Sequence, residues 1–79
     1  MSELERLTAV QRVEMYCEAR PASPSAVRRP RLMKRGRAWV ALLGPNLRDG
    51  ISGFGSTVES ALHSFDTQYL LYLRPPIAA

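Results

Sequence analysis

The side chains with the clearest chemical potential are the cations that stand close together between positions 28 and 37. This stretch has six Lys or Arg residues and no acid, whereas the rest of the 79-residue chain has five bases and seven acids. Such a cluster attracts phosphate groups or an acidic protein surface, and it raises association rates in a salt-dependent way. The competing interpretation is a solvated loop that only keeps the protein in solution. We predict that the partner-binding residues are Arg28, Arg29, Arg31, Lys34, Arg35 and Arg37.

Catalytic and metal chemistry are not indicated by the other reactive residues. His63 lies one helical turn from Glu59 and three residues from Asp66. These three residues are expected on the solvent face of a helix, without a nucleophile in an enclosed pocket. The chain has one cysteine, Cys17, and one histidine, which cannot supply a four-ligand zinc site by themselves. We therefore expect a protein that is not an enzyme and that holds no metal or other cofactor.

The size and composition of the chain fit a single domain over residues 1–79. Hydrophobic residues make up 46% of the chain and charged residues 23%, which argues against intrinsic disorder. No apolar run reaches the roughly 18 residues that span a bilayer. The polar, acidic start of the sequence also differs from a secretory signal. We therefore expect a cytoplasmic protein without a membrane segment.

The first half of the chain allows two assignments of secondary structure. Ser2 and Glu5 have the spacing of a capping box, which predicts a short helix from about residue 3 to residue 11. Apolar and polar residues then alternate over residues 13–20, which favours a strand with one wet face. A single helix running to Ala19 is the alternative, because no helix breaker interrupts it. The prolines and serines that follow predict an exposed basic loop over residues 21–37.

The second half of the chain has clearer strand and turn signals. Residues 37–43 are apolar on both faces, as in a central strand, and residues 44–50 supply a turn. Residues 51–56 would form the returning strand, in which Gly53 and Gly55 fall on one face. Positions without side chains let a helix approach the sheet closely. We expect the core to include the aromatic residues Trp39, Phe54 and Phe65; the alternative is an exposed Trp39 that stacks on a base beside Arg37.

The C-terminal helix is the clearest element of the sequence. A capping box at residues 56–59 would begin it, and Pro75 and Pro76 would end it at about residue 73 or 74. The predicted fold class is therefore α+β, with a three-stranded antiparallel sheet packed against this helix and a short N-terminal helix. The residues expected to cover the sheet recur at helical spacing and are Val58, Ala61, Leu62, Phe65, Tyr69, Tyr72 and Leu73.

Two leucines near the end of this helix, Leu70 and Leu71, fall outside the apolar stripe. An apolar edge on a small domain is often covered by a second copy of the chain, most commonly through a two-fold axis. We therefore predict a homodimer with Leu70, Leu71 and Tyr72 at its interface. The alternative is that the N-terminal helix covers these residues within one chain through Leu4 and Leu7.

Three resemblances to known classes of protein are carried by these elements. The element order, with Gly53, Gly55, Ser56 and Thr57 at the start of the last helix and Ala61 within it, resembles double-stranded RNA-binding domains. Such domains place their first strand–strand loop in an RNA minor groove. Residues 39–70 are similar to the strand–turn–strand–helix unit of HicB-type antitoxins. The same residues look more like small proteins encoded in phages, prophages and gene-transfer agents.

Proteins of that last kind include anti-CRISPR inhibitors, and the resemblance implies a function. It implies a non-enzymatic protein in a bacterial host that docks on a CRISPR surveillance complex and blocks target DNA binding. The partner would be a host protein or ribonucleoprotein complex, contacted through the basic segment. The alternative is a nucleic-acid-binding or antitoxin-like regulator that uses the same segment.

Overall fold

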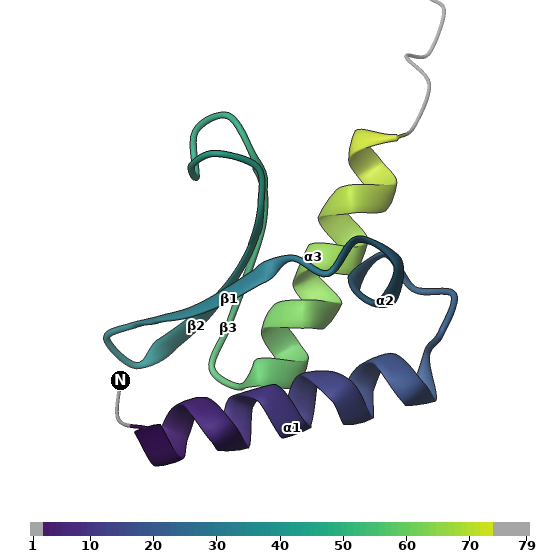
Figure 1. Ribbon diagram of the computed structural model, residues 1–79. Helices are drawn as coiled ribbons and strands as arrows, with labels where there is room; N and C mark the ends of the chain where they lie inside the picture. The colour runs from purple at the N-terminus through teal and green to yellow at the C-terminus, as the bar shows by residue number, and fades with distance from the viewer. Residues whose placement is uncertain (1–2, 74–79) are drawn as a thin grey trace, which may run out of the picture.

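The computed structural model describes the chain from residue 3 to residue 73, with side chains from residue 8 onward. Its elements are α1 (Glu3–Ala19), α2 (Pro24–Arg28), β1 (Arg31–Arg35), β2 (Ala38–Leu43), β3 (Ile51–Gly55) and α3 (Val58–Tyr72). The strands form one antiparallel sheet in the order β1-β2-β3, and α3 packs on that sheet (Figure 1). The predicted α+β class is therefore confirmed. None of the helices in this described part combines the length and apolar character that crossing a bilayer requires.

The strand predicted over residues 13–20 is wrong, because this segment forms the last turns of α1. The single-helix alternative is the correct one, and α1 is longer than the short helix that was expected. In the predicted strand, Met15 would point into the core and Tyr16 would point to solvent. In the structure, Met15 is 69% exposed and Tyr16 is buried. The buried residues Ala9, Tyr16 and Cys17 recur at helical spacing, so one face of α1 contacts the core.

The segment from residue 21 to residue 37 holds α2 and β1, where a loop was expected. The Ser23 hydroxyl caps α2 by accepting a hydrogen bond from the Ala26 amide at 3.2 Å, and Pro24 takes the first helical position. Arg29 ends α2 with a left-handed φ of 52°. A two-residue turn then joins β1 to β2, and its first residue, Gly36, has a φ of 62° that glycine adopts without strain.

The helices and the sheet meet on the inner face of the strands. In register, Leu32 of β1 lies opposite Ala41 of β2, which lies opposite Gly53 of β3. A Cβ atom on Gly53 would lie 2.1 Å from the Phe65 amide nitrogen, so α3 rests directly on the backbone of β3. The expectation that the β3 glycines permit close helix packing is therefore confirmed.

The start of α3 lies one residue later than the predicted capping box. Thr57, and not Ser56, is the N-cap, because its side chain accepts from the Ser60 amide at 3.0 Å. The Ser60 hydroxyl in turn accepts from the Thr57 amide, which completes a reciprocal cap. The capping box at Ser2 and the prolines expected to end α3 lie outside the described residues.

The buried face of α3 matches the prediction at its first five positions, from Val58 to Tyr69. Tyr72 and Leu73 were also expected to be buried, but they are 72% and 57% exposed. Tyr72 lines a hollow with Ile51 and Ser52 of β3, so the last turn of α3 does not pack closely on the sheet.

Asp66, which was expected on the solvent face of α3, is buried where the three helices meet. Its carboxylate accepts hydrogen bonds from the Tyr16 hydroxyl of α1 at 2.5 Å and from the Ser25 amide of α2 at 2.7 Å. The Ser25 hydroxyl donates to the same carboxylate at 2.6 Å. A buried carboxylate requires such partners, and Asp66 therefore fixes both α1 and α2 to α3.

Candidate functional site

All six cations predicted to bind a partner are exposed, but they lie on more than one face of the molecule. Arg28 belongs to α2 and Arg29 follows it, whereas Arg37 lies in the turn between β1 and β2. Successive side chains of a strand point to opposite faces. In β1 this alternation separates Arg31 and Arg35 from Lys34.

Three of these cations contact other side chains of the protein. The Arg28 guanidinium donates from Nε to the Tyr69 hydroxyl at 2.7 Å, and Arg29 forms an ion pair with Glu14 at 2.5 Å. The Lys34 ammonium lies 5.5 Å from the centre of the Trp39 ring, on the inner side of the sheet. These contacts hold α2 and β1 against their neighbours. Arg28, Arg29 and Lys34 are therefore less available to a partner than their exposure suggests.

The other side of the sheet faces away from α3, and we call it the outer sheet face. Its central row follows the strand register, in which Met33 lies opposite Val40 and Val40 lies opposite Phe54. The rows on either side begin at Arg31 and Arg35 of β1. The outer sheet face consists of Arg31, Met33, Arg35, Ala38, Val40, Leu42, Ser52 and Phe54.

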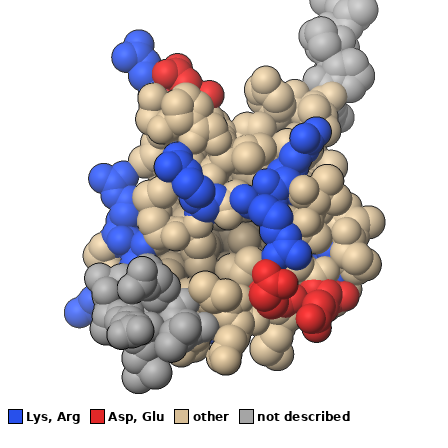
Figure 2. Space-filling view, viewed as in Figure 1, with Lys and Arg blue, Asp and Glu red and all other residues tan. Residues whose placement is uncertain are grey.

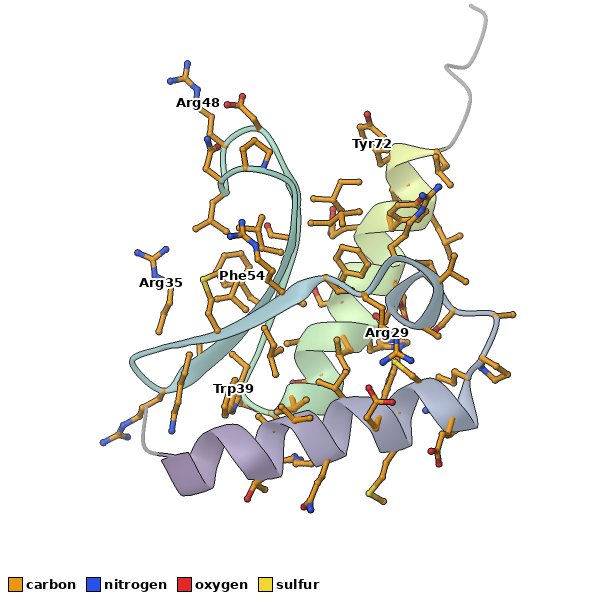
Figure 3. All side chains as sticks on the ribbon, viewed as in Figure 1. Arg29, Arg35, Trp39, Arg48, Phe54 and Tyr72 are labelled. Atoms are coloured by element: carbon orange, nitrogen blue, oxygen red, sulfur yellow. The ribbon has the colours of Figure 1, made fainter. Side chains whose placement is uncertain are left out.

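Phe54 is the residue of this face that the sequence reasoning missed. It was expected in the core, but it is 51% exposed. Figure 3 shows Phe54, Arg35 and Arg48 on the same side of the strands, away from α3. The signal was present in the sequence, because α3 covers the face of β3 that carries Gly53 and Gly55. Phe54 lies between these two glycines and must therefore point the other way.

The charge of the outer sheet face is entirely positive. Among the described residues, ion pairs engage Arg12 and Arg29 but not Arg31, Arg35 or Arg48. Arg31 donates one hydrogen bond to the Gly44 carbonyl oxygen at 2.8 Å, which directs its side chain along the β2–β3 loop. Figure 2, which views the molecule from the β1 edge, shows basic side chains over the front of the molecule and acidic ones near its upper and lower margins. The face therefore attracts an anionic ligand.

The residues considered for catalysis do not come together. Asp66 is engaged with Tyr16 and Ser25, while His63 is exposed on another side of α3. Arg12 donates from Nε to Glu59 at 2.8 Å, and this hydrogen bond holds the pKa of the Glu59 carboxyl below its ordinary value. The part of the chain that the structure describes contains no cluster of three or more metal-ligating side chains.

Cys17 is buried, and burial raises the pKa of its thiol above the ordinary value. A thiol in this state is a poor nucleophile, because the thiolate is the reactive form. Its burial in α1 agrees with a packing role.

The predicted dimer interface is exposed at the end of α3. Leu70, Leu71 and Tyr72 all retain more than half of their surface, and Leu70 and Leu71 line a shallow hollow with Thr67 and Leu73. The alternative was that α1 covers these leucines within one chain. In the described part of the molecule, the leucines remain uncovered.

The first turn of α3 carries Glu59, which is paired with Arg12. This helix start therefore offers no cation to a phosphate group.

Comparisons of the chain with protein-family models, with curated proteins and with solved structures find no match.

Proposed function

We propose that this protein is a non-enzymatic module that binds nucleic acid through the outer sheet face. The observation that supports this function is the placement of a half-exposed Phe54 in a sheet row between the rows of two arginines. Arginine recognises phosphate through paired hydrogen bonds, and an aromatic ring offers a surface on which a base stacks. A protein uses both interactions when it binds a nucleic acid chain.

The spacing of the cations also suits a polyanion. Arg31 and Arg35 are four residues apart on β1, which places their Cα atoms about 13 Å from each other along the strand. A nucleic acid strand repeats its phosphate charge along its whole length, so both arginines can contact one strand on either side of Phe54. A single small anion would engage only one of them.

Docking on an acidic protein, such as a host CRISPR surveillance complex, is the competing function and stays a prediction. The same arginines would serve it, and an apolar centre with a polar rim also occurs in protein interfaces. Nucleic acid is favoured because its charge and its stacking surfaces alternate along one chain. An acidic protein would need to match both features with a specific shape.

The experiment measures fluorescence anisotropy of labelled DNA and RNA, single-stranded and duplex, at about 150 mM salt. The test variant is Arg31→Gln with Arg35→Gln. The matched control is Arg20→Gln with Arg29→Gln, which removes the same charge outside the outer sheet face. We expect only the test variant to lose affinity, and its dependence on salt to weaken by about 0.7–0.9 in log–log slope for each arginine that contacts a phosphate.

Two results would contradict the proposed function. If no nucleic acid binds the wild-type protein at this salt concentration, the outer sheet face serves another ligand, and a protein partner becomes the better explanation. If the control variant loses as much affinity as the test variant, binding depends on overall charge or on α2 rather than on the outer sheet face.

A further inference from the structure

The outer sheet face has an apolar centre and a cationic border. Met33, Val40 and Phe54 form the central row, while Arg31 and Arg35 begin the neighbouring rows. Each neighbouring row is two residues away along the strand, or about 6.6 Å. A ligand that fits this pattern presents an apolar flat group at its centre and negative charge on both sides.

The apolar centre of the outer sheet face is not suited to recognising the base edges of a duplex. Base edges in a groove are recognised by hydrogen-bonding side chains, but β2 contributes only Ala38, Val40 and Leu42 to this face. The major groove of B-DNA, about 12 Å wide, admits a helix or a two-stranded ribbon. The three strands here span about 10 Å between the outer backbones alone, before their side chains are added.

Phe54 has the surroundings of a fixed stacking surface. Its neighbours in sequence, Gly53 and Gly55, both lie against α3, so the backbone on either side cannot move toward the helix. Behind the ring, Val40 is fully buried in the adjacent strand. An aromatic side chain held in this way loses little conformational freedom when a base stacks on it.

Cations continue the pattern along the length of the sheet. Figure 3 shows Arg35, Phe54 and Arg48 in that order, from the β1–β2 turn toward the β2–β3 loop. The Arg31 guanidinium donates one of its five N–H groups to the Gly44 carbonyl oxygen. Its other N–H groups can donate to a phosphate. A phosphate backbone laid along the sheet would therefore meet a cation before and after the aromatic ring.

From this geometry we infer that the ligand is a single-stranded nucleic acid, one base of which stacks on Phe54 while Arg31 and Arg35 hold the flanking phosphates. The inference rests on the proposed function and names its ligand class. The sugar is not selected by any group in this pattern, so single-stranded DNA and RNA are both expected to bind.

The test compares labelled oligo(dT) and oligo(U) of about 12 nucleotides with a duplex of about 16 base pairs. Phe54→Leu keeps an apolar side chain but removes the ring. Loss of base stacking should weaken single-strand binding by about 5- to 150-fold and leave weak duplex binding nearly unchanged. Met15→Ala is the matched control, because Met15 is an exposed apolar residue on α1, and it should have no effect.

A second variant, Phe54→Trp, retains the aromatic ring and adds a fluorescent reporter. Its emission should change when oligo(dT) binds, which gives a readout that does not depend on the stability of the leucine variant. The inference is wrong if the duplex binds as tightly as the single strands, or if Phe54→Leu binds oligo(dT) as well as the wild type does. If either result is obtained while nucleic acid binding still depends on Arg31 and Arg35, the proposed function stands and only this inference fails. If the protein binds no nucleic acid at all, both the proposed function and this inference are wrong.

Discussion

Replacing Asp66 with alanine should destabilise the protein more than replacing Glu59, the other acidic residue of α3. The substitution removes the acceptor of the Tyr16 hydroxyl and of the Ser25 amide, whereas the Ser25 hydroxyl keeps the Leu62 carbonyl oxygen, 3.2 Å away, as an acceptor. Each buried polar group without a partner costs about 1–3 kcal/mol. Because donors of one network do not contribute additively, we expect a loss of about 3–5 kcal/mol in the free energy of unfolding.

This loss is large for a chain of 79 residues. At roughly 0.05–0.15 kcal/mol per residue, its whole free energy of unfolding is about 4–12 kcal/mol. Asp66→Asn keeps the shape and one acceptor oxygen, so its loss should be smaller, about 1–2 kcal/mol. Tyr16→Phe removes one hydrogen bond to a charged group, and it should cost about 1.5–3 kcal/mol.

The assay is urea unfolding followed by circular dichroism, with Thr67→Ala as the surface control on the same helix. That control should change stability by no more than about 0.5 kcal/mol. Tyr16→Phe added to Asp66→Ala should cost little beyond Asp66→Ala alone, because their shared hydrogen bond is already absent. A loss below about 1 kcal/mol for Asp66→Ala would refute the reasoning, since the carboxylate would then not fix the helices.

Three further predictions concern packing, pH and association. Gly53→Ala should destabilise the protein by at least about 1–3 kcal/mol in urea unfolding, because its Cβ would meet the Phe65 amide; a change as small as that of Ser52→Ala would contradict the close packing. The Arg12–Glu59 pair is partly exposed, so it should stabilise the fold by only about 0.2–1 kcal/mol. Since the folded pKa of Glu59 is lowered, this contribution is present above about pH 4.3 and is lost as the pH falls through the lower folded pKa. The difference in urea midpoint between the wild type and Glu59→Gln should therefore shrink as the pH falls below the ordinary carboxyl pKa of about 4.3, and a constant difference would refute this assignment. Leu70→Glu with Leu71→Glu should convert a wild-type dimer into a folded monomer in light scattering, and a wild-type mass of one chain at all concentrations would exclude the dimer.

The sequence predicted the C-terminal half of the fold well, because its signals there are local. The glycines of β3 stand on the face that α3 covers, and the first five residues of the apolar stripe of α3 are buried as expected. Residues 37–43 are apolar on both faces, and β2 is the central strand. Each of these assignments depends on spacing within about twenty residues.

The first half failed where the deciding contacts are distant in the sequence. The pattern over residues 13–20 fits both a strand and a helix, and the burial of Tyr16 depends on Asp66, 50 positions away. An aspartate on an amphipathic helix is expected in water, and no local pattern indicates its partners on α1 and α2. The strand β1 was missed because it is rich in cations, whose β-propensity is low or neutral.

The charge of β1 has two physical explanations, edge protection and the proposed binding of an anionic ligand. As an edge strand, β1 presents unpaired backbone groups, and charged side chains there prevent pairing with another chain. Protection of this kind needs charge but not a particular sign, and the other edge strand, β3, has no charged residue. The charged residues of β1 are all basic. Two of them, Arg31 and Arg35, border the row that ends at Phe54 on β3. Edge protection accounts for neither the sign nor this placement, whereas the proposed anionic ligand, lying across all three strands, would account for both.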